Sequence, residues 1–178
     1  MLAPYLAGNK NLQIIEKRIT ELFKGEKENE QRAISKCMPD LMSFFKEPLK
    51  IVENIYTNIG TMTPEWLQIG QAYLFSGLLK GIGYNETHSF LDKIISNEYV
   101  AKTKGEKLGR IHLINALVEN FGRVMELKGV KIISIMLGYM ADSIPEIREI
   151  SKKVGQTLIV KMSSYSVKIL LPELLKGL

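Results

Sequence analysis

The stretch from Thr63 to Gly83, TPEWLQIGQAYLFSGLLKGIG, decides the fold class. Its apolar and small residues recur at the three- and four-residue steps that line one face of an α-helix, at Trp66, Ile69, Gly70, Tyr73, Leu74, Gly77 and Leu78. We predict Thr63 as the N-cap, Pro64 at the first helical position and Gly83 as the C-terminal cap. Gly70 and Gly77 each lower helix propensity by about 1 kcal/mol relative to alanine. We therefore interpret them as points where a neighbouring backbone comes close.

A second apolar pattern recurs on both sides of this helix. It is an apolar pair followed two residues later by further apolar residues, and its copies begin at residues 14, 51, 90, 132 and 169. The steps between them are 37, 39, 42 and 37 residues, the range of HEAT and armadillo repeats. Second helices are expected between the copies, near residues 28–45, 106–124 and 144–162.

This period predicts an all-α fold, a right-handed α-solenoid of HEAT repeats with about four helix pairs plus an extra C-terminal helix. The alternating apolar runs that indicate strands are lacking in the sequence. We expect one array over residues 1–178, with repeats at about 10–46, 47–83, 86–125 and 127–163 and an incomplete one at 165–178. Because the last predicted helix is apolar and no partner helix follows it, we expect the chain to be a piece of a larger protein.

A few residues are predicted to shape the repeats. Pro39 lies inside the second helix of the first repeat and should kink it. Asp142 closes a turn and Arg148 begins the next helix, an Asp-turn-Arg arrangement typical of HEAT repeats, in which such side chains bond across successive turns. The predicted structural signature comprises Pro39, Gly70, Gly77, Asp142, Arg148 and Pro172.

Composition places few demands on function. The 178 residues carry a net charge of +5, with 46% hydrophobic and 24% charged residues, as in ordinary folded proteins. A single cysteine excludes an internal disulfide, and the two histidines lie too far apart in sequence to anchor a metal site on their own. No apolar run approaches the roughly 20 residues that cross a bilayer, and the start at Met1 to Tyr5 does not resemble a signal peptide.

Each residue that could perform chemistry has a structural interpretation that we prefer. Cys37 lies in an apolar-rich helix, where a small buried side chain is expected. His112 is interpreted as a packed or flanking histidine and His88 as a surface residue. Gly81-Ile82-Gly83 follows no strand and lacks a phosphate-binding motif, and Glu146 with Glu149 is a solvated pair. We expect no enzyme activity, no catalytic, cofactor-binding or metal residues, and no small-molecule substrate.

The best candidate for binding is basic. Lys102, Lys104, Lys107 and Arg110 gather over nine residues, and Lys152 and Lys153 recur one repeat later. Because equivalent positions of stacked repeats align, these side chains could form a ridge that binds RNA phosphates. The alternative is an ordinary solvated turn.

Three stretches carry a resemblance to a known family. They are residues 34–41 (ISKCMPDL), 70–83 (GQAYLFSGLLKGIG) and the C-terminal run with Ile147-Arg148-Glu149, Met162-Ser163 and SVKILLPELL at 166–175. In this order and spacing they resemble the translational activators of general amino-acid control, giant HEAT-repeat proteins. Departures occur at Gln68, at Lys107-Leu108-Gly109 and at Asn115, where the family has Arg, Arg-Glu-Gly and Glu.

The resemblance implies a cytoplasmic scaffold that binds ribosomal RNA and proteins, senses stalled ribosomes and helps to activate the kinase of initiation factor two alpha. Its partners would be ribosomes and translation-control proteins, with no membrane. An alternative is a general protein-interaction scaffold, of the nuclear-transport, phosphatase-scaffold or tubulin-binding type.

Overall fold

A computed structural model describes residues 10–96 and 100–176, and the expectations for Met1 to Tyr5 and for the last two residues lie outside this part. The described residues form helices and no strand. Nine are α-helices: α1 (Lys10–Leu22), α2 (Glu28–Leu41), α3 (Pro48–Asn58), α4 (Glu65–Ile82), α5 (Tyr84–Ile95), α6 (Lys104–Phe121), α7 (Gly129–Met140), α8 (Pro145–Lys161) and α9 (Ser164–Lys176). Three are 3-10 segments: η2 (Met42–Phe44), η3 (Ile59–Thr61) and η4 (Gly122–Lys128).

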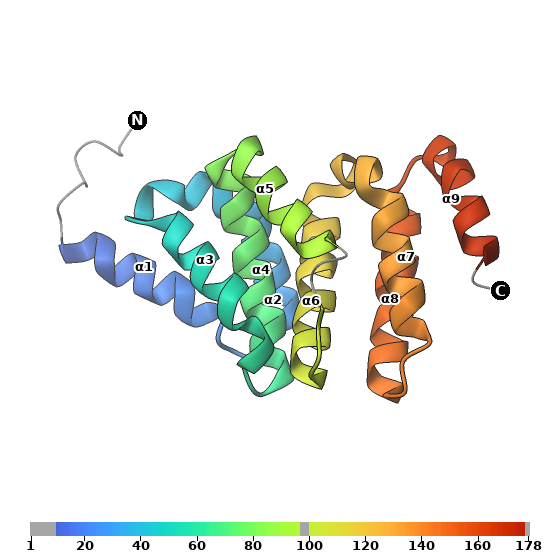
Figure 1. Cartoon of the computed structure of the whole chain (residues 1–178). Helices are drawn as coiled ribbons and strands as arrows, with labels where there is room; N and C mark the ends of the chain where they lie inside the picture. Colours follow the sequence, from blue (N-terminus) through green and yellow to red (C-terminus); the bar gives the residue numbers. More distant parts are fainter. Residues whose placement is uncertain (1–9, 97–99, 177–178) are drawn as a thin grey trace.

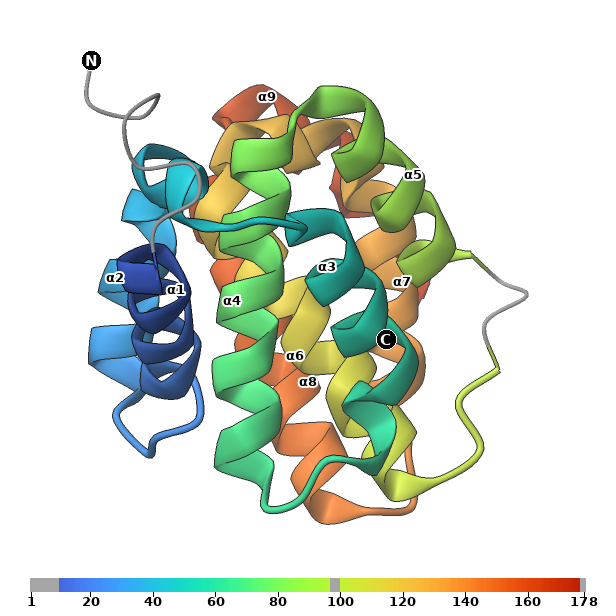
Figure 2. The same ribbon diagram turned by 90° about the vertical axis from the view of Figure 1, so that its left-hand side faces the viewer.

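The helices alternate between two positions along the chain. The second helices α2, α4, α6 and α8 pack consecutively against one another, and α3, α5 and α7 lie along one side of them (Figures 1 and 2). The five recurring apolar patterns fall in α1, α3, α5, α7 and α9. The prediction of an all-α helical repeat solenoid is confirmed.

The glycines of α4 lie against α2, as the sequence predicts. A Cβ atom on Gly70 would lie 2.0 Å from the main-chain oxygen of Phe23, and one on Gly77 would lie 2.8 Å from that of Ser35. Both distances are far below van der Waals contact. Only glycine therefore lets α4 pack this closely on the first repeat.

Two local predictions are wrong. α4 begins at Glu65, and Pro64, which has extended backbone, occupies the N-cap position, so Thr63 lies one residue too early to cap the helix. Cys37 is exposed, because it lies on the face of α2 that α4 does not cover. Pro39 does lie inside α2, which ends two residues later at Leu41 and continues as η2.

The fourth residue of each second helix donates a hydrogen bond to a turn. The acceptor lies either in the turn before the same helix or in the turn before the next second helix. Gln31 Nε2 bonds the Gly25 oxygen at 2.7 Å, Gln68 Nε2 bonds the Met62 oxygen at 3.0 Å, and Arg148 Nη1 bonds the Asp142 oxygen at 2.9 Å. The fourth member is Lys107, whose Nζ reaches forward to the Asp142 carboxylate at 2.5 Å. Arg148 thus bonds the main chain of Asp142, whereas the Asp142 carboxylate is bound by Lys107 of the preceding repeat.

None of the described helices is long and apolar enough to cross a membrane. No cluster of potential metal-binding side chains occurs among residues 10–96 and 100–176.

Candidate functional site

A groove of about 440 Å³ crosses the second helices. Its walls mix charged and apolar side chains, and all of them come from α2, α4, α6 and α8. The lining residues are Glu28, Arg32, Glu65, Ile69, His112, Asn115, Glu119, Ile150, Lys153, Val154 and Thr157.

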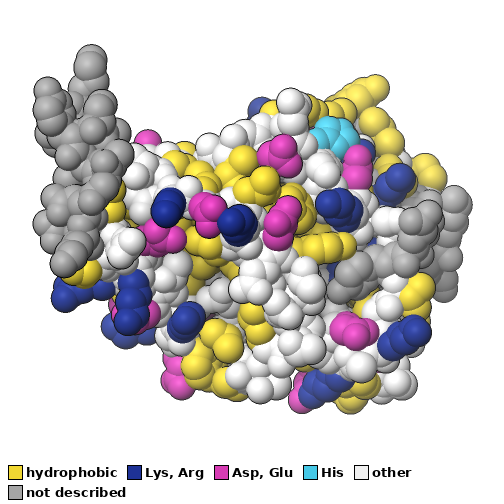
Figure 3. Space-filling model, turned by 60° about the vertical axis from the view of Figure 1, so that its left-hand side comes forward, with side chains coloured by type: hydrophobic (Ala, Val, Ile, Leu, Met, Phe, Trp, Pro, Cys, Tyr) yellow, Lys and Arg dark blue, Asp and Glu magenta, His cyan; other side chains and the backbone are white. Residues whose placement is uncertain are grey.

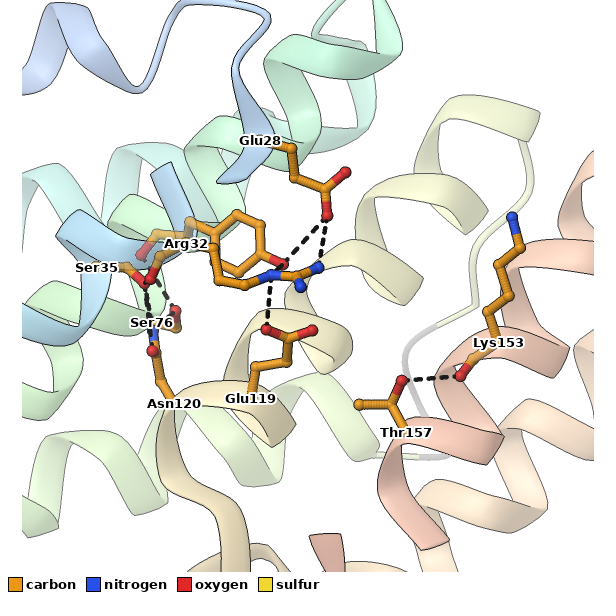
Figure 4. Close-up of polar contacts among 9 residues, drawn as sticks. Glu28, Arg32, Ser35, Ser76, Glu119, Asn120, Lys153 and Thr157 are labelled. Atoms are coloured by element: carbon orange, nitrogen blue, oxygen red, sulfur yellow. Dashed lines mark hydrogen bonds and ion pairs between the residues drawn. The ribbon is translucent and has the colours of Figure 1, made fainter. Parts of the chain in front are cut away.

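Arg32 organises the charges at the α2 side of the groove. Its Nη2 lies 2.9 Å from Glu28 Oε1 and its Nε lies 3.0 Å from Glu119 Oε2 and from the Tyr73 hydroxyl (Figure 4). Burial raises the pKa of Tyr73 well above its ordinary value, so this phenol keeps its proton. Since two carboxylates already face the guanidinium of Arg32, it is not available as an anion site. The arrangement instead fixes acidic side chains from two helices at one end of the groove.

A buried polar cluster lies beside this charge network (Figure 4). Asn120 Nδ2 donates to Ser76 Oγ at 2.6 Å and lies 3.2 Å from Ser35 Oγ. These residues belong to α6, α4 and α2, and all three are buried. Because an amide in the interior must find partners, the cluster fixes the relative rotation of the three helices. This holds the groove lining in place.

The middle of the groove carries a histidine–carboxylate pair. His112 Nε2 lies 3.1 Å from Glu65 Oε1, and only 7% of the His112 side chain is exposed. The hydrogen bond from His112 holds the pKa of Glu65 below its ordinary value, and Glu65 is therefore ionised at neutral pH. His112 is packed as the sequence predicts, and its partner is a groove carboxylate.

The α8 side of the groove is basic. Lys153 is exposed and lies across the groove from Arg32 (Figure 4). Within the described part of the chain, no ion pair involves Lys153. The groove thus has acidic side chains on α2, α4 and α6 and an open lysine on α8.

The predicted basic ridge is not formed as a unit. Arg110 is buried, and its guanidinium donates to the Ile94 oxygen at 2.8 Å and to the Ser96 oxygen at 2.9 Å at the end of α5. Including Arg110 in an exposed ridge was therefore wrong, since its side chain points into the packing between α5 and α6.

The lysines of the predicted ridge divide into two groups. Lys107 pairs with Asp142, and Lys104 pairs with Glu146, both across the junction to the next repeat. The hydrogen bond from Lys107 lowers the pKa of Asp142. Of the lysines in the predicted ridge, Lys102, Lys152 and Lys153 are exposed and have no ion pair within the described residues.

Sequence reasoning missed most of the groove. Glu28 and Arg32 are one helical turn apart, as are Asn115 and Glu119, and Lys153 and Thr157. Polar pairs at this spacing on three of the four second helices, α2, α6 and α8, were the available signal. Each pair by itself resembles ordinary solvated surface, and the groove appears only when the helices are placed side by side.

Comparison with known proteins identifies relatives along nearly the whole chain. It is 26% identical over 176 residues to the eIF-2-alpha kinase activator GCN1 of Dictyostelium discoideum, covering 97% of this chain and 7% of that protein. It is 25% identical over 185 residues to the protein ILITYHIA of Arabidopsis thaliana, covering 99% of this chain and 7% of that protein. To GCN1 of Saccharomyces cerevisiae it is 25% identical over 153 residues, covering 83% of this chain and 6% of that protein.

These alignments confirm the resemblance to the translational activators of general amino-acid control. The chain spans about 7% of the length of the first two relatives. No protein-family model matches it, and no solved structure gives a significant match.

Proposed function

We propose that this chain is a non-catalytic scaffold segment of a cytoplasmic, ribosome-associated translational activator. In this role it senses stalled ribosomes and promotes activation of the kinase of initiation factor two alpha. The observation that carries the proposal is the similarity to two proteins named eIF-2-alpha kinase activators, which extends over 97% of the chain for one of them. An array of packed helix pairs supports a scaffold role, since such arrays present extended surfaces to large partners.

The surface proposed for ribosomal RNA comprises Lys102, Lys152 and Lys153, the predicted basic residues that are exposed and lack an ion pair in the described part. Lysines at a surface attract RNA phosphates by releasing counterions, which makes binding sensitive to salt. Lys104 contributes less to this surface because Glu146 partly neutralises it.

The test is cosedimentation of the 178-residue chain with ribosomes at increasing salt. Changing Lys102, Lys152 and Lys153 to Glu should reduce the bound fraction and flatten its salt dependence. The matched control changes the same number of exposed lysines elsewhere, Lys17, Lys36 and Lys46, and should bind as the parent chain does. Equal loss in both variants would contradict a role for this surface.

A second experiment addresses the kinase. The aligned segment of Dictyostelium GCN1 is replaced by this chain, and phosphorylation of initiation factor two alpha is measured during amino-acid starvation. We expect more phosphorylation than in cells whose GCN1 lacks the segment. Restored ribosome binding without restored phosphorylation would limit the role of this segment to the ribosome.

The groove favours one alternative, a general protein-interaction scaffold of the nuclear-transport, phosphatase-scaffold or tubulin-binding type. Its carboxylates Glu28, Glu65 and Glu119 suit a protein with basic side chains better than an RNA. A pull-down that recovers transport cargo or phosphatase subunits, and no ribosomal proteins, would support this alternative.

A further inference from the structure

An apolar cavity of about 250 Å³ lies where α4 ends and α5 begins, away from the groove. Two glycine turns lie next to it: Gly83 between α4 and α5, with φ of 133°, and Gly122 after α6, with φ of 52°. These turns bring the start of α5 opposite η4. The lining residues are Lys80, Gly83, Tyr84, Thr87, His88, Leu91, Phe121, Val124, Met125, Leu127 and Lys128.

The rim of this cavity exposes large apolar side chains. Tyr84 is 64% exposed, Val124 53% and Leu127 84%. Figure 3 shows hydrophobic side chains beside the cyan histidine at the upper edge of the molecule. An exposed apolar group around a cavity is a common mark of a binding site, whereas single exposed apolar residues are not.

The segment that carries Val124 and Leu127 is held in place. Met125, between them, is 1% exposed. The carboxylate of Glu126 accepts hydrogen bonds from the Ser163 backbone nitrogen at 2.6 Å and from Ser166 Oγ at 2.5 Å, at the start of α9. Because η4 is fixed from within, its outward side chains present a preformed surface, and a partner loses little free energy in ordering it.

The cavity lining contains the basic side chains of Lys80, His88 and Lys128 and no Asp or Glu side chain. Lys128 Nζ and His88 Nδ1 lie 2.6 Å and 2.9 Å from the carboxylate of Asp92, just outside the lining. Lys80, in the last turn of α4, has no ion pair within the described residues. Arg123, which precedes the lining residue Val124 in sequence and lies outside the lining, is exposed. This charge favours an acidic occupant.

We propose that the cavity binds a short segment of a partner protein that presents one large apolar side chain flanked by Asp or Glu residues. The volume fits this occupant, since a cavity of about 150 Å³ already holds a benzene ring. The apolar side chain would enter between Leu91 and Met125, and the flanking carboxylates would face Lys80 and Arg123. The proposal does not depend on ribosome binding.

The test is a selection of random seven-residue peptides against the 178-residue chain, followed by affinity measurement of the enriched peptides. We expect an apolar residue flanked by acidic ones, and we expect backbone amide NMR shifts at Leu91, Val124 and Leu127. Leu127→Glu, at an exposed position, should weaken binding about tenfold or more, because a carboxylate would be desolvated beside an acidic ligand. Lys80→Glu should weaken peptide binding less than Leu127→Glu does, and it should reduce the salt dependence of that binding.

Val160→Glu is the matched control, since Val160 is 81% exposed on α8 and lies outside the cavity lining. It should leave the affinity unchanged. The proposal is overturned if enriched peptides are basic or lack an apolar residue, if nothing is enriched over the Leu127→Glu chain, or if Leu127→Glu binds as well as the parent. Self-association of the chain that Leu127→Glu abolishes would also overturn it, because a second copy would then cover the cavity.

Discussion

α4 and α8 are second helices of their repeats, yet α4 is buried along most of its length and α8 on one face. Every residue from Gly70 to Leu79 is buried, whereas the buried residues of α8 recur at helical spacing: Ile147, Ser151, Val154, Gly155 and Leu158. The reason is the number of neighbours. α4 packs between two other second helices, α2 and α6. In the described part of the chain, α8 packs against one other second helix, α6. The same repeat position is therefore buried on more sides in α4 than in α8.

The largest expected effect comes from the glycines of the two helices. Gly70→Ala should lower the free energy of unfolding by about 3 kcal/mol or more, because the new methyl group would overlap the Phe23 main chain. In Gly155→Ala the methyl group would meet the Cδ1 atom of Ile133 at 3.7 Å, an ordinary contact distance, and the flexible end of Met140 at 3.1 Å. A gain in helix propensity of about 1 kcal/mol should offset that contact. Urea unfolding of both variants tests the difference, and equal losses would show that α4 is not more tightly packed than α8.

A smaller effect is expected from the buried polar side chains. Asn120→Ala should lower the free energy of unfolding by about 1 to 3 kcal/mol, because it leaves the Ser76 hydroxyl without its partner on α6. Ser151 of α8 bonds the Ile147 oxygen of its own helix at 2.7 Å. Ser151→Ala should therefore change stability less, as measured by the same unfolding curves. A larger loss from Ser151→Ala would contradict the greater dependence of α4 on its neighbours.

The junction between α6 and α8 depends on charge, and pH tests it. The folded pKa of Asp142 lies below its ordinary value because Lys107 donates to it, so the pair stabilises the fold above that ordinary value of 3.8. This stabilisation should be lost as pH falls below about 4 through the folded pKa. Asp142→Asn should remove part of the acid-induced loss of stability in unfolding curves measured from neutral pH to pH 2. An unchanged pH profile in the variant would show that the pair contributes nothing.

The smallest expected effect is at Gln68, which occupies in α4 the place of Arg148 in α8. Gln68 Oε1 is buried and has no hydrogen-bond partner among the described residues, while the amide nitrogen faces the oxygens of Met62 and Gly105. An arginine side chain has hydrogen-bond donors and no acceptor, so it would leave no unpaired oxygen at this position. Gln68→Arg should therefore raise the free energy of unfolding by up to about 1 kcal/mol. Thermal unfolding with Gln68→Leu as the control would measure it. A fall in stability would show that this junction lacks room for the larger side chain.

Much of the fold could be predicted from the sequence, and little of the groove. The apolar period located α1, α3, α5, α7 and α9, and the close approach at Gly70 and Gly77 followed from the cost of glycine in a helix. Periodicity reports which face of one helix is buried. It does not report which charges meet across repeats, and for this reason Arg110 and Lys107 were placed in a solvent-facing ridge.

The hydrogen bonds from the fourth residue of each second helix have a consequence for sequence divergence. Gln31, Gln68 and Arg148 donate to main-chain oxygens, which every amino acid supplies equally well. The turn residues that accept these bonds can therefore change by mutation while the bond persists. Lys107 differs, because its acceptor is the side chain of Asp142 and both residues must change together. The turns of an array built in this way can keep their shape while their amino acids drift, and of these four hydrogen bonds the one between Lys107 and Asp142 restricts drift most.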